Sequence, residues 1–178
     1  GMLYAVMVHP PRFGARLKSM DASATLKLTG VNEVVETARG VVIVADSIWV
    51  ADQARQSLKL EWSDSNAETR SSTDLGAYFR SLADTQGRAV SNKGDIAAAE
   101  DAAYRSIELE FEFPYLAHAT MEPLNCVVEL GADSCLIWTA AQAPSLDVPL
   151  VAQVTGNAPA KDVRHPPVAG GRCGRRGV

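Results

Sequence analysis

Three kinds of residue in the last third of the chain could do chemistry: an amide, a carboxylate near a histidine, and a run of glycines. The amide belongs to Gln142, which follows an apolar run ending at Trp138 and stands just before Pro144. An amide donates and accepts hydrogen bonds without adding charge, so this position predicts a ligand-facing side chain. The alternatives are an amide that caps the following helix and one that faces water.

Glu122 is the carboxylate, at a Glu-Pro corner four residues after His118. One hypothesis places it in a buried corner near a ligand. The other, which we favour, is a structural carboxylate that accepts hydrogen bonds from local backbone N–H groups around Pro123. His118 could pair with Glu122, but the spacing does not make either residue a catalytic base.

The glycines lie in Gly170-Gly171-Arg172-Cys173-Gly174, with Arg175 and Arg176 directly after them. Because glycine has no Cβ, its backbone can approach a ligand closely. Successive backbone N–H groups in such a turn can meet anionic oxygens. A glycine-rich stretch alone is a weak indicator of a binding site.

Read together, these motifs resemble a known family. The pattern is H-A-T-M-E-P-x-N-C from His118, W-x-x-x-Q-x-P from Trp138, V-x-H from Val163 and G-G-x-x-G-R-R from Gly170. It resembles the large molybdenum-binding subunit of the xanthine dehydrogenase/aldehyde oxidase family, and within it the β subunits of the isoquinoline 1-oxidoreductase-like branch. The resemblance covers nearly the whole chain.

The resemblance implies an α+β fold in two parts. Residues 1–90 would form an α/β hammerhead-like domain, and residues 91–178 the N-terminal, truncated part of a molybdenum cofactor-binding domain. It also implies a cofactor-binding set in which the Gln142 amide bonds an oxygen ligand on molybdenum and the glycines approach the pterin. This set is Gln142, Gly170, Gly171, Cys173 and Gly174. Arg172 replaces the third glycine of the family pattern and Cys173 replaces its phenylalanine, which puts contact at that point in doubt.

The implied function is part of a molybdenum hydroxylase, an oxidoreductase that hydroxylates an N-heterocycle or aldehyde with oxygen derived from water. The parent protein would hold a molybdopterin cofactor and pair with an iron–sulfur subunit and with the rest of its own large subunit. The family's catalytic glutamate matches no position here, so we expect the chain alone to be inactive and to bind no cofactor or metal. A non-catalytic binding or assembly module with the same frame is the alternative, and a homo-oligomer is an alternative partner arrangement.

Composition narrows the remaining classes of function. The chain has 178 residues, 47% of them hydrophobic and 21% charged, with a net charge of −4. This balance disfavours a nucleic-acid-binding surface. The three cysteines form no C-x-x-C pair, so we expect Cys126 and Cys135 to be buried apolar residues and not metal ligands. No apolar run reaches the ~18 residues of a membrane span, and the compartment is not readable.

Periodicity predicts the elements that must position these residues. Strands are expected at Leu3–His9, Val31–Thr37, Gly40–Ala45 and Leu58–Trp62, with a helix capped by Asp46 or Ser47 before the last of them. The strongest alternation is at Ser106–Phe113, where four apolar residues alternate with Glu108, Glu110 and Glu112. We expect this segment to be a strand. Apolar runs on either side of Gly131–Ser134 predict a β-hairpin, followed by a helix that Gly156 ends.

Overall fold

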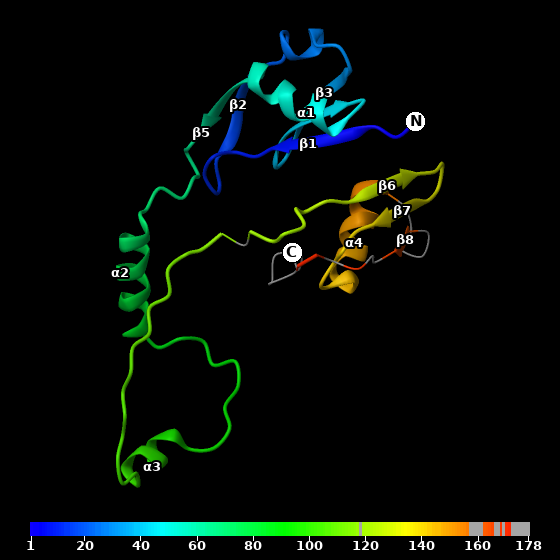
Figure 1. Cartoon of the computed structure of the whole chain (residues 1–178). Helices are drawn as coiled ribbons and strands as arrows, with labels where there is room; N and C mark the ends of the chain where they lie inside the picture. Colours follow the sequence, from blue (N-terminus) through cyan, green and yellow to red (C-terminus); the bar gives the residue numbers. More distant parts are fainter. Residues whose placement is uncertain (118, 157–161, 166–167, 169, 172–178) are drawn as a thin grey trace. The chain divides into compact units, whose positions relative to one another are not determined.

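A computed structural model describes all residues except 118, 157–161, 166–167, 169 and 172–178. The chain has mixed helices and small sheets (Figure 1). It divides into two compact units, unit 1 over Gly1–Ile107 and unit 2 over Glu108–Val178. The assignment of residues 1–90 to a hammerhead-like domain stays a prediction.

Unit 1 begins with two small antiparallel sheets, ordered β1-β4-β3 and β2-β5. Its first elements are β1 (Tyr4–Val8), β2 (Arg16–Asp21), η1 (Thr25–Lys27), β3 (Val31–Thr37), β4 (Gly40–Ala45), α1 (Ile48–Ala54), η2 (Arg55–Ser57) and β5 (Lys59–Ser63). The strand predictions for this region are confirmed. Ser47 is the N-cap of α1, where its hydroxyl accepts the Val50 N–H at 3.2 Å.

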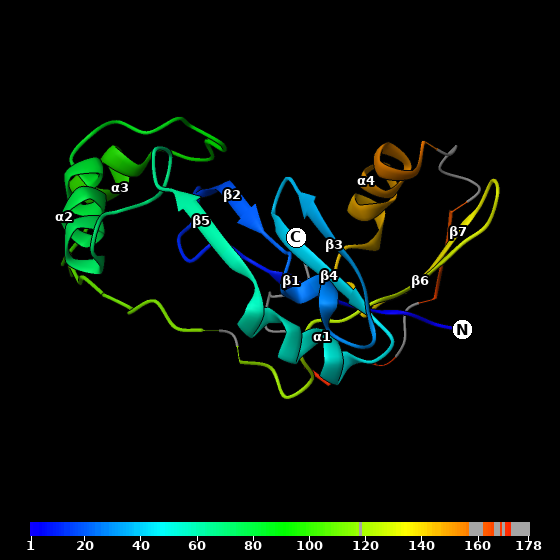
Figure 2. The same cartoon turned by 90° about the horizontal axis from the view of Figure 1, so that it is seen from above.

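The core of unit 1 lies between β4 and α1, which covers one face of the β1-β4-β3 sheet (Figure 2). Ile43 and Ala45 of β4 and Ala51 and Ala54 of α1 are all fully buried. The small alanines let the helix approach the central strand closely, and the β-branched residues of β4 fill the pleated surface.

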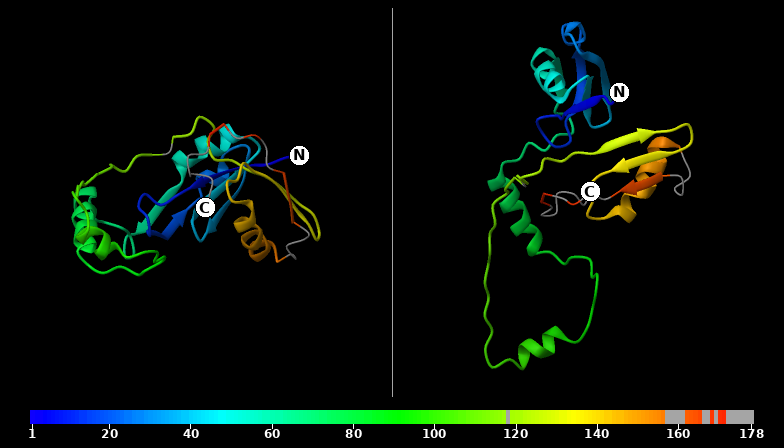
Figure 3. Two further views of the ribbon diagram at one scale, coloured as in Figure 1. Left: turned by 90° about the horizontal axis from the view of Figure 1, so that it is seen from below. Right: turned by 45° about the vertical axis from the view of Figure 1, so that its right-hand side comes forward.

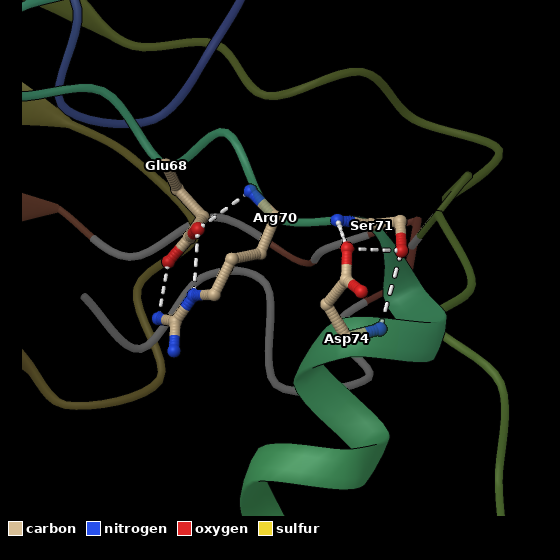
Figure 4. A network of polar contacts seen from close by, with 4 residues as sticks. All are labelled: Glu68, Arg70, Ser71 and Asp74. Carbon is tan, nitrogen blue, oxygen red and sulfur yellow. Dashed lines mark hydrogen bonds and ion pairs between the residues drawn. The ribbon is translucent and has the colours of Figure 1, made fainter.

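Unit 1 also contains α2 (Ser72–Ala83) and α3 (Ile96–Asp101). A capping box starts α2: the Ser71 hydroxyl accepts the Asp74 N–H at 3.1 Å, and the Asp74 carboxylate accepts the Ser71 N–H at 2.9 Å (Figure 4). Hydrogen bonds from Ser71 lower the pKa of the Asp74 carboxyl. Just before the helix, the Arg70 guanidinium donates to both oxygens of Glu68 and lowers the pKa of Glu68 to about 2.

Unit 2 holds β6 (Val127–Leu130), β7 (Cys135–Trp138), α4 (Pro144–Thr155) and β8 (Asp162–His165). β6 and β7 form the predicted hairpin, and β8 adds parallel to β7. Parallel neighbours need a crossover, and α4 supplies it beside β8 (Figure 3). Gly156 ends α4 at φ 74°, as expected of a left-handed C-cap.

The prediction of a strand at Ser106–Phe113 is wrong. In the structure this segment belongs to no strand, and Ile107, Leu109, Phe111 and Phe113 are all exposed. Alternation shows that a segment suits a half-buried sheet position, but a strand forms only where a neighbouring strand pairs with its backbone. No other strand of the described chain pairs with this segment.

The cysteine prediction is half right. Cys135 is 2% exposed and lies at the start of β7, whereas Cys126, just before β6, is exposed. The prediction is wrong for Cys126 because this residue leads into β6, none of whose residues is buried. In the part of the chain that the structure describes, none of the helices has the length and apolar character that a bilayer span requires.

Candidate functional site

The Glu-Pro corner of unit 2 is held by side chains on both sides of Glu122. The Thr120 hydroxyl donates to the Glu122 carbonyl oxygen at 2.7 Å. The Asn125 amide donates to Glu122 Oε1 at 3.0 Å and to the Pro123 carbonyl at 2.8 Å. These bonds fix both the backbone and the carboxylate of Glu122, which is half-buried.

The second carboxylate oxygen of Glu122 reaches across to the glycines. The Gly170 N–H donates to Glu122 Oε2, and the Glu122 N–H donates to the Gly170 carbonyl at 3.3 Å. The two residues are 48 positions apart in sequence. The expectation that Glu122 serves a structural purpose therefore fits these bonds, and one of its backbone N–H donors is that of the distant Gly170.

The same contact explains why position 170 is a glycine. A Cβ at Gly170 would lie 2.8 Å from the Glu122 Cβ and 3.1 Å from Oε2, which is closer than packed atoms allow. Gly171 has φ +134° and lies against Thr120, where an added Cβ would be 3.2 Å from the Thr120 Cβ. Packing therefore favours glycine at position 170, and backbone conformation favours it at position 171.

Gln142 lies in the loop between β7 and α4, with its side chain exposed. The N-cap of α4 is Ala143, and Pro144 occupies its first turn. The same loop is tied to the Glu-Pro corner, because the Thr139 hydroxyl donates to the Asn125 carbonyl at 3.3 Å. A line of contacts therefore runs from this loop through Asn125 and Glu122 to Gly170.

We call Thr120, Glu122, Asn125, Thr139 and Gly170 the corner network. Sequence reasoning singled out Glu122 and Gly170 but missed the two threonines and Asn125. The signal for Asn125 was its place three residues after Glu122, within reach of a carboxylate at a turn. Cys173, Gly174 and His118, also proposed from sequence, lie outside the described residues.

An oxygen-rich cofactor needs hydrogen-bond donors, and these can be sought in the corner network and in the neighbouring Gly171 and Gln142. The Gly170 N–H donates to the Glu122 carboxylate, and its assignment as a cofactor contact stays a prediction. Gly171 brings backbone without a Cβ, and the Gln142 amide has two donor positions and an acceptor oxygen. The residue types at these two positions suit an oxygen-rich cofactor, and the contacts predicted for them stay predictions; Gly170 anchors the turn through Glu122. Among the residues described, no group of three His, Cys, Asp or Glu side chains is placed to hold a metal ion.

A separate hollow of about 150 Å³ lies in unit 1, lined among others by Arg16, Arg39, Glu36 and Trp62. Its charges are mixed, and it contains none of the residues proposed from sequence. It therefore adds no candidate for the predicted chemistry.

Unit 2 is thus a crossover α+β unit in which the Gly170 backbone is bonded to the distant Glu122. The sequence pattern of the molybdopterin cofactor-binding domain family matches residues 82–176, more than half of the chain. The chain belongs to this family.

The chain is also similar to individual proteins of known name. The chain is 29% identical over 191 residues to isoquinoline 1-oxidoreductase subunit beta of Brevundimonas diminuta, covering 99% of this chain and 24% of that protein. It is 26% identical over 186 residues to the membrane-bound aldehyde dehydrogenase [pyrroloquinoline-quinone] of Gluconacetobacter polyoxogenes, covering 99% and 24%. The chain therefore spans about a quarter of the length of these curated relatives.

The fold is also similar to solved structures. Quinoline 2-oxidoreductase from Pseudomonas putida 86 superposes with a TM-score of 0.69 at 20% identity, over 99% of this chain and 28% of that one. At this identity the likeness establishes the fold alone. It agrees with the predicted α+β class.

Proposed function

We propose that the chain forms part of a molybdenum hydroxylase subunit, an oxidoreductase that hydroxylates an N-heterocycle or an aldehyde with oxygen derived from water. Family membership supports the cofactor class, and the names of the relatives support the substrate classes. The observation that carries the proposal is the bond from Gly170 to Glu122, which fixes the glycine turn within the segment that the family pattern matches.

The role of each residue follows from its contacts. Glu122 holds the turn through the Gly170 N–H, and Asn125 holds the carboxylate of Glu122 in place. Gly171 would let the cofactor approach the backbone closely, and the Gln142 amide would hydrogen-bond one of its oxygens. Cys173 and Gly174 are the remaining proposed contacts. When bound, the molybdenum cofactor supplies the redox centre that accepts electrons from the substrate.

The remaining parts of the proposal concern the assembly. The rest of the large subunit supplies the catalytic glutamate, and an iron–sulfur subunit takes the electrons away. By itself the chain is inactive and holds no cofactor. A binding or assembly module without a cofactor is the competing function.

The test is the cofactor content of the complex that a tagged copy of this chain forms in its native host. Elemental analysis measures molybdenum, and fluorescence of the oxidised pterin measures molybdopterin. Near-stoichiometric amounts of both, with oxidation of an N-heterocycle or aldehyde, support the proposal. Pyrroloquinoline quinone in place of molybdopterin, or no cofactor at all, would overturn it.

A matched pair of variants tests the residue that carries the proposal. Glu122→Gln replaces a charge-assisted hydrogen bond by a neutral one of about half the strength, so we expect reduced molybdenum retention. Glu129→Gln makes the same chemical change on the exposed face of β6 and should retain the cofactor fully. Equal molybdenum retention in the two variants would show that Glu122 does not contribute to the cofactor site.

A further inference from the structure

Gln142 is carried by residues 139–143, here named the Gln142 loop, which join β7 to α4. The Ala141 N–H donates to the Thr139 carbonyl at 3.1 Å and closes a tight turn around Ala140. Ala140 is only 3% exposed, so the centre of this turn is buried. The backbone that leads into Gln142 is therefore restrained.

The backbone that follows Gln142 is restrained as well. Pro144 lies in the first turn of α4, where its ring fixes φ, and the Leu146 N–H donates to the Ala143 carbonyl at 2.9 Å. The Gln142 side chain is exposed. A polar side chain on a loop restrained at both ends suits a ligand contact, because little conformational freedom remains to be lost on binding.

A side-chain bond ties the Gln142 loop to the corner network. The Thr139 hydroxyl donates to the Asn125 carbonyl oxygen at 3.3 Å. Asn125 is itself held in place, because its amide donates to Glu122 Oε1 at 3.0 Å and to the Pro123 carbonyl at 2.8 Å. Thr139 therefore links the loop to the same group of bonds that holds the Gly170 N–H on Glu122 Oε2.

We propose that Thr139 is a positioning residue, which sets the Gln142 amide relative to the turn at residues 170–171 so that both meet the cofactor together. The inference rests on the proposed function, because Gln142 is the cofactor contact through which Thr139 acts. Thr139 itself does not touch the cofactor. Without its hydroxyl the loop loses the bond to Asn125, and the Gln142 amide spends less time in the position from which it reaches the cofactor oxygen.

The test compares variants in the complex that a tagged copy of this chain forms in its native host. Thr139→Val keeps the branched shape and removes the hydroxyl, whereas Thr139→Ser keeps the hydroxyl. Thr155→Val is the matched control, because it removes a hydroxyl bond to the Val151 carbonyl at the other end of α4. Elemental analysis follows the rate of molybdenum loss from the purified complex, and mass spectrometry follows amide hydrogen exchange of residues 139–143.

We expect Thr139→Val to lose molybdenum about three- to tenfold faster than the wild type, which corresponds to the loss of one ordinary hydrogen bond. Exchange of residues 139–143 should quicken to a similar extent, while unchanged exchange in β6 and β7 would show that the hairpin stays folded. Thr139→Ser and Thr155→Val should both stay close to the wild type in molybdenum loss and in exchange.

The double variant Thr139→Val/Gln142→Ala separates positioning from a general structural role. Gln142→Ala alone should lose molybdenum faster than the wild type. Because Thr139 acts through Gln142, the double variant should lose molybdenum no faster than Gln142→Ala does.

Two results would overturn the inference alone. Additive losses in the double variant would make Thr139 a general stabiliser of unit 2. Wild-type molybdenum loss in Thr139→Val, beside fast loss in Gln142→Ala, would show that the loop keeps its position without the hydroxyl. Wild-type molybdenum loss in Gln142→Ala would instead withdraw the cofactor contact from the proposed function, and the inference with it. A wild-type complex without molybdenum would overturn both.

Discussion

At the scale of single residues, Glu122 shows how one side chain can join two distant motifs. It receives Asn125 on one oxygen and the Gly170 N–H on the other, while its own backbone N–H donates back to Gly170. Hydrogen bonds to an ionised carboxylate are stronger than those between neutral groups, so these two bonds favour one orientation of the Glu122 side chain. The glycine turn thus owes its position to the Glu-Pro corner.

We predict that Gly170→Ala disrupts this clamp. The new Cβ would meet the Glu122 Cβ at 2.8 Å, so either the turn or the corner must move, at a cost of about 1–3 kcal/mol. The measurement is hydrogen exchange of the residue 170 amide together with the melting of unit 2. Gly87→Ala is the control, because nothing lies within 4 Å of a Cβ at that position. Unchanged protection at residue 170 would show that the clamp tolerates a side chain.

The ion pair before α2 predicts a pH dependence. The Arg70 guanidinium, donating to Glu68 at 2.5 and 2.9 Å, lowers the pKa of Glu68 to about 2. A lowered carboxyl pKa contributes stability that is present above the ordinary value of 4.5 and is lost as the pH falls towards 2. Arg70→Gln should raise the pKa of Glu68 towards its ordinary value, incompletely, because the backbone N–H at position 70 still donates.

NMR titration of the Glu68 carboxyl carbon measures this change. Lys93→Gln removes a cation elsewhere in the chain and should leave the Glu68 titration as it is. If Arg70→Gln also left the titration unchanged, the guanidinium would not be the cause of the lowered pKa.

Local sequence foresaw only part of the corner network. Glu122 was identified as a carboxylate at a Glu-Pro corner, and Gly170 as part of a glycine-rich stretch. The bond between Glu122 and Gly170 was not foreseeable, since it joins positions 48 apart and depends on the crossover that brings β8 beside β7. The sequence pattern contains Asn125 but does not show that its amide reaches back to Glu122 and Pro123.

At the scale of elements, prediction succeeded where partners are close in sequence. β3 and β4 have the predicted bounds, and β6 and β7 form the predicted hairpin, since short turns bring each pair together. Prediction failed at Ser106–Phe113, where apolar and charged side chains alternate as in a strand but no strand of the described chain pairs with the backbone. Periodicity in the sequence indicates which side chains share a face, but not whether a neighbouring strand is present to pair with the backbone.

Among elements, α2 depends on its N-terminal cap. None of its residues is buried, so core packing contributes little and the capping box contributes much of its local order. We predict that Ser71→Ala costs about 1 kcal/mol of local helix stability, seen as faster amide exchange in the first turn. Ser81→Ala, on the same helix, removes only a bond to the Tyr78 carbonyl and should have no such effect. Equal effects of the two changes would contradict the capping role.

At the scale of the whole molecule, the two units have cores of different kinds. Unit 1 buries Ile43 and Ala45 of one central strand against a helix, and Val41 of the same strand is also fully buried. In the described part of unit 2, the buried hydrophobic residues are Cys135 and Ala140. The difference agrees with a chain that spans about a quarter of its relatives, because a unit with so small a core gains most from a covering partner.

We predict that the two units respond separately to a change in the core of unit 1. Ile43→Ala removes a fully buried side chain beneath α1 and should destabilise unit 1 by about 2–5 kcal/mol. Ile48→Ala, at a 57% exposed position of α1, should cost far less and is the matched control. Hydrogen exchange, read by NMR, follows β4 for unit 1 and the β6–β7 hairpin for unit 2. Exchange in β4 should accelerate strongly in Ile43→Ala, while exchange in the hairpin should stay at its wild-type rate, because the hairpin's backbone hydrogen bonds lie within its own sheet. Acceleration of both to the same extent would mean that the chain unfolds as one cooperative body.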